Sequence, residues 1–339
     1  MKISVFGCGA WGTAIALLLR ENGHDVTMWS KFEGEAENLR LTRENPLLSG
    51  IRLPEDIYVT SDMPKAVCGI GAAVLAVPSF AVRETAEALR TEISDDCIVI
   101  CMSKGIEKET SSLFTTVLRE AFGRETPVVS VSGPTHAEEV SRGIPTACVA
   151  ASESEDAAGQ VQNLLMNEYF RVYTTTDVIG VELGAALKNV IALCAGICDG
   201  LGFGDNTMAM LMTRGLAEIA TLCVKMGGRK ETLAGLAGLG DLIVTCISDH
   251  SRNRRAGVLI GKGMPVEDAM KKVGAVVEGY FAAKAARDLS EAMGVDMPIC
   301  REAYKVLYEG KSPLTAMRGL MSRERKSELN SGEQTWVTG

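Results

Sequence analysis

A single lysine, Lys188, interrupts the otherwise small and apolar stretch ELGAALKNVIALCAG at residues 182–196. If this stretch is a helix, the residues three and four positions away share its face. They are Gly184, Ala185, Ile191 and Ala192. Such a face would let a ligand approach closely, and partial desolvation lowers the pKa of an ammonium group toward neutrality. Lys188 could then exchange a proton with an alkoxide, or it could equally be a lysine whose stem carries the ammonium group out to water.

Two further charged residues could assist such a proton transfer. Lys104 follows a predicted strand, and ligands of open α/β sheets bind at the carboxyl ends of the strands. A solvated loop cation is the other interpretation of Lys104. Asp241, in GLGD, could orient Lys188 or bind a substrate hydroxyl, or it could cap the helix that LIVTC begins.

The stretch DHSRNRRAG at residues 249–257 has the features of an anion site. Ser251 is a plausible N-cap, which places Arg252 and Asn253 in the first turn of a helix. Free backbone N–H groups, a positive helix end and an arginine together bind phosphate well. A capped helix with solvated arginines would give the same pattern.

Three glycines follow the strand-like segment KISVF with the spacing of a dinucleotide-binding turn. Gly7, Gly9 and Gly12 lie between this segment and an Ala- and Leu-rich helical stretch. That context provides a tight turn, a close backbone approach to a pyrophosphate and close packing of helix on strand. An ordinary strand-to-helix turn is the alternative.

The end of the second predicted strand, DVTMWS, bears on the choice of cofactor. NAD-preferring sites usually have Asp or Glu there, whereas this strand ends at Ser30 and is followed by Lys31. We therefore expect NADPH to be preferred, unless Lys31 is an ordinary surface lysine. Glu33 and Glu35 could reach the ribose if the loop folds back, so NADH remains a possible cofactor.

The elements that would position these residues change character near residue 176. Up to about residue 175, β-rich runs such as AAVLAVP and CIVICMS alternate with amphipathic segments such as FAVRETAEALRTEI. This alternation predicts a mainly parallel sheet covered by helices on both faces. From residue 176 to residue 322 the sequence predicts helices, with GLAGLGD forming a helix end or tight turn. The polar tail, 323–339, is expected to be poorly ordered.

Composition excludes several classes of protein. The 339 residues carry a formal net charge of -8, which argues against a nucleic-acid-binding surface. No uninterrupted apolar run approaches the roughly 20 residues of a membrane span, and no signal peptide precedes KISVF, so we expect a cytoplasmic protein without a membrane span. His24, His136 and His250 are too scattered to suggest a metal site, and none is expected.

Several stretches together carry a family resemblance. They are GCGAWGTA, AVPSF, SKGIE, SGPTHAEEV, ELGAALKNVIALCAGICDGLGFGDN, GLAGLGDLIVTC, SRNRRAG and VVEGY. In this order, from residue 7 to about residue 320, the chain resembles the bacterial-type NAD(P)-dependent glycerol-3-phosphate dehydrogenases. One departure is the pair Ser30 and Lys31, where the family commonly has a more basic pair.

The resemblance implies a fold and a reaction. It implies a Rossmann-type NAD(P)-binding domain at residues 1–175 and an all-α substrate-binding domain at residues 176–322, similar to the C-terminal domain of 6-phosphogluconate dehydrogenase. The implied reaction is the reversible reduction of dihydroxyacetone phosphate to sn-glycerol 3-phosphate, which feeds glycerophospholipid synthesis. In the family motif the position of Lys188 is the proton donor and acceptor, and we expect Lys104 and Asp241 to assist it.

The same resemblance implies two sets of binding residues. For the substrate they are Lys104, Gly133, Thr135, Lys188, Asp241, Ser251, Arg252 and Asn253. For the cofactor they are Gly7, Gly9, Ala10, Trp11, Gly12, Lys31, Lys104, Ala137, Arg252, Val277 and Glu278.

Other functions and assemblies stay open at this point. A reductase of another keto acid could share the two-domain plan, although a phosphate grip at Arg252 argues against it. A noncatalytic dinucleotide sensor would bind NADPH without turnover. The Met-rich helices of the second half could cover a homodimer interface or form an internal core.

Overall fold

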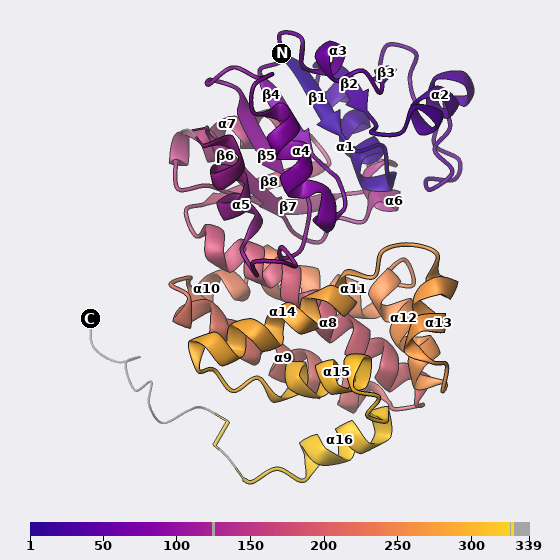
Figure 1. Ribbon diagram of the computed structural model, residues 1–339, viewed down its shortest axis with the longest axis vertical. Helices are drawn as coiled ribbons and strands as arrows, with labels where there is room; N and C mark the ends of the chain where they lie inside the picture. Colours follow the sequence, from indigo (N-terminus) through magenta and orange to yellow (C-terminus); the bar gives the residue numbers. More distant parts are fainter. Residues whose placement is uncertain (124–125, 326, 329–339) are drawn as a thin grey trace.

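The computed structural model describes residues 1–123, 126–325 and 327–328, and the chain divides at the end of its last strand. The N-terminal half contains the sheet and the C-terminal half is helical (Figure 1). The predicted fold class, a mainly parallel α/β domain followed by an all-α domain, is confirmed. From residue 329 on, the polar tail falls outside the described residues.

Within the described residues, one eight-stranded sheet has the order β3-β2-β1-β4-β5-β6-β7-β8. Its strands are β1 Lys2–Phe6, β2 Asp25–Trp29, β3 Tyr58–Thr60, β4 Ala72–Leu75, β5 Ile98–Cys101, β6 Val128–Ser132, β7 Thr146–Ala151 and β8 Phe170–Thr175. All neighbouring pairs are parallel except β6 with β7, which is antiparallel. Sequence patterning missed β3, because a three-residue strand is too short to display a period.

Helices cover both faces of this sheet. They are α1 Ala10–Glu21, α2 Glu33–Thr42, α3 Met63–Val67, α4 Val82–Leu89, α5 Phe114–Phe122, α6 Ala137–Val140 and α7 Glu155–Leu165. Alternate residues of β5 face opposite sides, so Ile100 belongs to the core under α1 and α7, whereas Val99 belongs to the core under α4 and α5. The sheet is therefore buried on both sides, and its carboxyl edge remains as the place for ligands.

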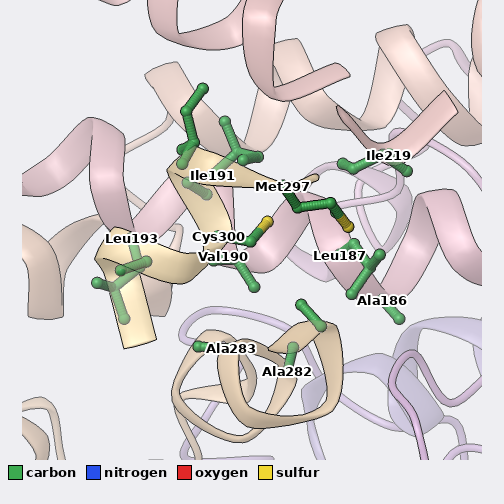
Figure 2. Close-up of a cluster of buried hydrophobic side chains, with 14 of the residues drawn as sticks. Ala186, Leu187, Val190, Ile191, Leu193, Ile219, Ala282, Ala283, Met297 and Cys300 are labelled. Carbon is green, nitrogen blue, oxygen red and sulfur yellow. The ribbon is translucent and has the colours of Figure 1, made fainter. Parts of the chain in front are cut away.

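The helical half is built around α8, Val178–Gly200, which crosses the middle of the domain (Figure 1). The helices that follow are α9 Asp205–Lys225, α10 Lys230–Leu233, α11 Asp241–Ile247, α12 Arg252–Gly261, α13 Val266–Val273, α14 Glu278–Met293, α15 Pro298–Tyr308 and α16 Pro313–Met321. Figure 2 shows Leu187 and Val190 of α8 in a cluster with Ala282 of α14 and Cys300 of α15. This cluster fixes the helix that carries Lys188.

Glycines allow α8 and α12 to cross at backbone contact. A Cβ atom built on Gly196 would lie 2.0 Å from the Arg254 carbonyl oxygen, and one on Gly257 would lie 2.1 Å from the Leu193 oxygen. Either distance is far below van der Waals contact. These small residues therefore hold the helix that begins with Arg252 directly against the helix of Lys188.

The segment GLAGLGD differs from its predicted helix end or tight turn. It forms a π-helical turn, Leu236–Gly240, that continues directly into α11. Gly184 of α8 permits this, because a Cβ atom there would lie 2.7 Å from the Ala237 carbonyl oxygen. The wide turn delivers Asp241 to the side of α8, and π-helical turns often occur at functional sites.

Two described helices, α8 and α9, are long and apolar enough by composition to cross a membrane, and the bent pair 230–247 and 252–261 also qualifies if it counts as one span. The apolar window of α8 is 89% buried inside the protein, and that of α9 is 39% buried. Interspersed polar residues hid these helices from a search for unbroken apolar runs. The expected absence of a membrane span stays a prediction.

Candidate active site

A cluster of three charged side chains lies where the two halves of the chain meet. The Lys188 Nζ atom is 2.8 Å from Oδ1 of Asp241, and the Lys104 Nζ atom is 2.9 Å from Oδ2 of the same carboxylate. Lys188 also donates to the Thr245 hydroxyl at 2.7 Å. The side chains of Lys188 and Asp241 are 6% and 2% exposed, so the ammonium group of Lys188 does not extend to water along its stem.

Burial and mutual attraction set the protonation of this cluster in opposite directions. Burial lowers the pKa of Lys188 to about 8, helped by repulsion from Lys104 and opposed by the attraction of Asp241. Burial alone would raise the pKa of the Asp241 carboxyl, but Lys104 and Lys188 together hold it below its ordinary value. A lysine with a pKa near 8 can both give and take a proton near neutral pH.

The loops after β5 and β6 bring the N-terminal half to this cluster. Lys104, three residues beyond β5, donates to the Gly133 carbonyl oxygen at 2.8 Å and contacts the Thr135 hydroxyl at 3.3 Å. Gly133 has φ +154°, and a Cβ atom there would lie 2.8 Å from the Cα atom of Cys148. Only glycine therefore fits this turn.

The sequence had led us to expect that the small-residue face of α8 would be open to a ligand. In the structure, other segments cover it. The Ala237 backbone occupies the space beside Gly184, and the side chains of Ile191 and Ala192 are fully buried. Small residues on α8 therefore serve close helix packing. Lys188 reaches the cluster through its own side chain, and Asp241, as the first residue of α11, orients both lysines.

The start of α12 has the capped geometry that the sequence predicted. The Ser251 side chain accepts a hydrogen bond from the Arg254 N–H at 3.2 Å. The Arg252 side chain is exposed and makes no hydrogen bond or ion pair with any other residue that the structure describes, whereas Arg254 pairs with Asp249 and Asp199. Arg252 is thus the arginine placed to meet a ligand.

Asn253 is more constrained than a simple phosphate ligand. Its amide nitrogen donates to the Asn189 side-chain oxygen at 2.9 Å, and its own oxygen accepts from the Gly279 N–H at 2.8 Å. The amide therefore ties α12 to α8 and α14. One N–H of the amide nitrogen is left for a ligand, because an asparagine amide carries two.

The glycine-rich turn has the shape that a bound dinucleotide requires. A Cβ atom on Gly7 would lie 2.6 Å from the Ala76 carbonyl oxygen, and one on Gly12 would lie 1.9 Å from the Gly7 oxygen, so both positions need glycine. A Cβ atom on Gly9 would meet nothing within 4 Å. Gly9 precedes α1 without a side-chain cap, which leaves the N–H groups of Ala10 and Trp11 for an anion. These residues fit the pyrophosphate of NAD(P).

Two predicted contacts of the nicotinamide end lie at the start of α14. Val277 is buried, and the half-buried Glu278 accepts hydrogen bonds from Ser79, which follows β4. Burial raises the pKa of Glu278, while Ser79 and the nearby Arg252 oppose that shift. The other predicted residue, Ala137, is buried at the start of α6 in the loop after Thr135.

Acidic residues lie near Lys31, the cation predicted to meet the adenosine end of the cofactor. Lys31 forms an ion pair with Glu84 of α4, and both side chains are more than half exposed. The Ser30 hydroxyl donates to the Glu35 carboxylate, and Glu33 is held instead by Ser61 and Arg40. The sequence had suggested Glu33 and Glu35 equally, and the structure brings only Glu35 to Ser30.

Sequence reasoning missed several residues near this site. Thr245 lies one helical turn after Asp241, and that spacing on LIVTC was the available signal. Asn189, next to Lys188, was indistinguishable from an ordinary polar helix residue. Phe32 and Phe80 follow β2 and β4 and are 68% and 72% exposed, which only the structure reveals.

Comparison with known proteins now decides the family. The family model described as the NAD-dependent glycerol-3-phosphate dehydrogenase N-terminus matches residues 2–158, and the corresponding C-terminus model matches residues 177–318. The chain belongs to the NAD-dependent glycerol-3-phosphate dehydrogenase family. This confirms the predicted family and the predicted class of enzyme, an NAD(P)-dependent oxidoreductase.

Relatives in this family match over their full length. The chain is 49% identical to the glycerol-3-phosphate dehydrogenase [NAD(P)+] of Fusobacterium nucleatum, over 98% of this chain and 99% of the relative. It is 51% identical to the enzyme of the same name from Thermoanaerobacter sp., over 97% and 99%. The crystal structure of glycerol-3-phosphate dehydrogenase from Coxiella burnetii superposes with a TM-score of 0.91 at 34% identity, over 95% of this chain and 99% of that one.

Proposed function

We propose that this protein reduces dihydroxyacetone phosphate reversibly to sn-glycerol 3-phosphate with NADPH or NADH. The observation that carries the proposal is the buried cluster of Lys188, Asp241 and Lys104, which combines a lysine of lowered pKa with a second cation. The chain also provides a dinucleotide turn before α1 and an exposed arginine at the start of α12. Those are the three parts that reduction of a phosphorylated ketone needs.

The residues of the cluster divide the chemistry among themselves. When bound, the reduced cofactor supplies the hydride. Lys188 donates the proton to the carbonyl oxygen of the substrate, and in the reverse direction it removes the proton from the alcohol. Asp241 orients Lys188, and Lys104 adds positive charge near the oxygen on which negative charge develops.

The substrate phosphate binds at the start of α12. The Arg252 guanidinium, the Ser251 hydroxyl and the second N–H of the Asn253 amide are available for it. The positive end of α12 adds to this attraction. Gly133 and Thr135, already in contact with Lys104, line the opposite side.

The remaining assignments are proposals of the same kind. Gly7, Gly9, Ala10, Trp11, Gly12 and Ala137 hold the cofactor, with Val277 and Glu278 at its nicotinamide end. Both NADPH and NADH serve as cofactor, and Lys31 offers a cation to the 2′-phosphate of NADPH. Residues 1–175 form the cofactor domain and residues 176–322 form the substrate domain.

The enzyme acts in the cytoplasm and supplies phospholipid backbones. Its proposed assembly as a homodimer can be tested by light scattering.

The phosphate grip provides the test of this function. We expect turnover of dihydroxyacetone phosphate, and little turnover of a branched 2-keto acid that lacks phosphate. Arg252→Ala should raise KM for dihydroxyacetone phosphate by about tenfold to a hundredfold, from the loss of one charge-assisted contact. The same variant should not change the slow reduction of dihydroxyacetone, which has no phosphate.

A matched control is Arg255→Ala, which removes an exposed arginine of the same helix whose guanidinium donates to the Val273 oxygen. If Arg252→Ala and Arg255→Ala raise KM equally, the phosphate assignment is wrong. If the wild-type protein binds NADPH without reducing any of these ketones, the noncatalytic sensor becomes the better description.

A further inference from the structure

We propose that Glu35 and Glu84 restrain the binding of a 2′-phosphate, so that the enzyme binds NADH and NADPH with similar affinity. This inference rests on the proposed function, since it concerns the cofactor of the same site. It departs from the pattern at Ser30 and Lys31, which by itself favours NADPH. Glu35 belongs to α2 and Glu84 to α4, so neither carboxylate is part of the sequence at the end of β2.

Glu84 acts by occupying the cation that a 2′-phosphate would need. It lies in the first turn of α4, and its carboxylate pairs with the ammonium group of Lys31, which follows β2. Lys31 can meet a phosphate only by leaving Glu84 or by sharing its charge between two anions. Part of the attraction that Lys31 offers is therefore already satisfied. NADH, which has no 2′-phosphate, does not meet this competition.

Glu35 supplies the carboxylate that the end of β2 lacks. It accepts a hydrogen bond from Ser30, whose side chain is buried directly after β2. Its charge also acts on Cys8 in the glycine-rich turn, where burial chiefly and Glu35 secondly raise the pKa of the thiol. Glu35 is thus close both to the end of β2 and to the glycine-rich turn. A carboxylate there accepts a hydrogen bond from a 2′-hydroxyl and repels a 2′-phosphate.

The two carboxylates should therefore differ in their effect on NADH. Removing the charge of Glu84 frees Lys31 and changes only NADPH binding. Removing the charge of Glu35 relieves repulsion of NADPH but also weakens the acceptor for the ribose hydroxyl of NADH. The signs of the changes for the two cofactors distinguish the two roles.

The experiment measures the Kd of NADPH and of NADH separately, without substrate, by quenching of protein fluorescence. Wild type is compared with Glu84→Gln and Glu35→Gln, and each has a control on its own helix, Glu87→Gln on α4 and Glu37→Gln on α2. Both control positions are exposed glutamates. They report the effect of removing one negative charge from the surface without touching Lys31 or Ser30.

We expect wild-type Kd values within about threefold of each other. Glu84→Gln should tighten NADPH by about twofold to fivefold, as for an exposed ion pair, and leave NADH unchanged. Glu35→Gln should tighten NADPH and weaken NADH. If Glu84→Gln and Glu87→Gln give the same NADPH affinity, the proposal is overturned, even if Glu35→Gln fails to fold. Turnover of dihydroxyacetone phosphate is assayed apart, so loss of the proposed reaction would leave these binding results interpretable.

Discussion

This enzyme contains two contrasting lysine–carboxylate pairs, Lys188 with Asp241 where the two halves of the chain meet and Lys31 with Glu84 in the N-terminal half. The side chains of the first pair are 6% and 2% exposed, and those of the second are 54% and 64% exposed. The chemistry of the two pairs is the same, and their surroundings differ. Burial lowers the pKa of Lys188 to about 8, which makes proton exchange near neutral pH feasible at the buried pair.

Water explains the contrast. An exposed pair interacts through a high dielectric and is screened by salt, so it typically contributes about 0–1 kcal/mol. A buried pair has lost its hydration, and each charge then depends on its partner. At the buried site Lys104 shares the Asp241 carboxylate with Lys188, and the repulsion between the two ammonium groups adds to the lowering of the Lys188 pKa.

The largest expected effect is that of removing the buried lysine. Lys188→Met keeps the length of the side chain and removes the proton donor, so kcat should fall by about 10²- to 10⁴-fold. NADPH binding should persist, because the glycine-rich turn is untouched. Initial rates with dihydroxyacetone phosphate and fluorescence quenching by NADPH measure the two effects.

A control for this experiment is Lys284→Met, which removes a partly exposed lysine of α14. It should leave kcat near that of wild type. If Lys188→Met retained kcat within a few fold of wild type, Lys188 would not be the proton donor.

Buried carboxylates without a lysine partner show the effect of burial on the pKa of an acidic group. Glu182 of α8 accepts hydrogen bonds from the N–H and hydroxyl of Thr115 in α5, and burial raises its pKa to about 7. Because the folded state holds this proton between its ordinary pKa of 4.5 and about 7, stability is lost as the pH rises through that window. The shift corresponds to on the order of 3 kcal/mol. Glu182→Gln should remove that part of the pH dependence in urea unfolding.

Glu218 offers a second, independent case. It accepts hydrogen bonds from the N–H groups of Ile299 and Cys300, and burial raises its pKa to about 7 as well. Each single Gln variant should therefore flatten the pH dependence of stability in part, and the double variant more. An unchanged slope in Glu182→Gln would show that this carboxyl does not hold its proton.

The pH dependence of the reaction itself should change kcat by about tenfold. Reduction needs Lys188 protonated, so its kcat should fall as the pH rises through about 8, whereas oxidation of the alcohol should rise over the same range. Asp241 raises the pKa of Lys188, so Asp241→Asn should move both transitions to lower pH, by about one unit. Profiles of kcat in both directions test this, and a shift to higher pH would contradict it.

The sequence predicted those parts of the molecule that depend on local pattern. Gly7, Gly9 and Gly12 stand between a strand and a helix, which is enough to predict the dinucleotide turn. The cap of Ser251 was likewise predicted from its neighbours. Family motifs named Lys188, Lys104 and Asp241 before the structure brought their side chains together.

What escaped prediction depends on distant segments. Glu84 is 53 residues from Lys31, and no local pattern indicates that their side chains meet. The π-helical turn before Asp241 arises because Gly184 allows close contact with Ala237, and a glycine-rich sequence alone suggests a helix end. The small face of α8 was interpreted as open for the same reason, since periodicity identifies a face and not what covers it.

The smallest expected effect lies at the exposed pair, and it completes the comparison. Lys31→Ala should change the free energy of unfolding by less than about 0.5 kcal/mol, because the pair is solvated and screened. It should nevertheless weaken NADPH about twofold to fivefold and leave NADH unchanged, with a difference that shrinks as salt is added. In the Lys31→Ala background Glu84→Gln should lose most of its effect on NADPH, because Glu84 then has no cation to withhold. An undiminished effect would mean that Glu84 acts on the cofactor directly.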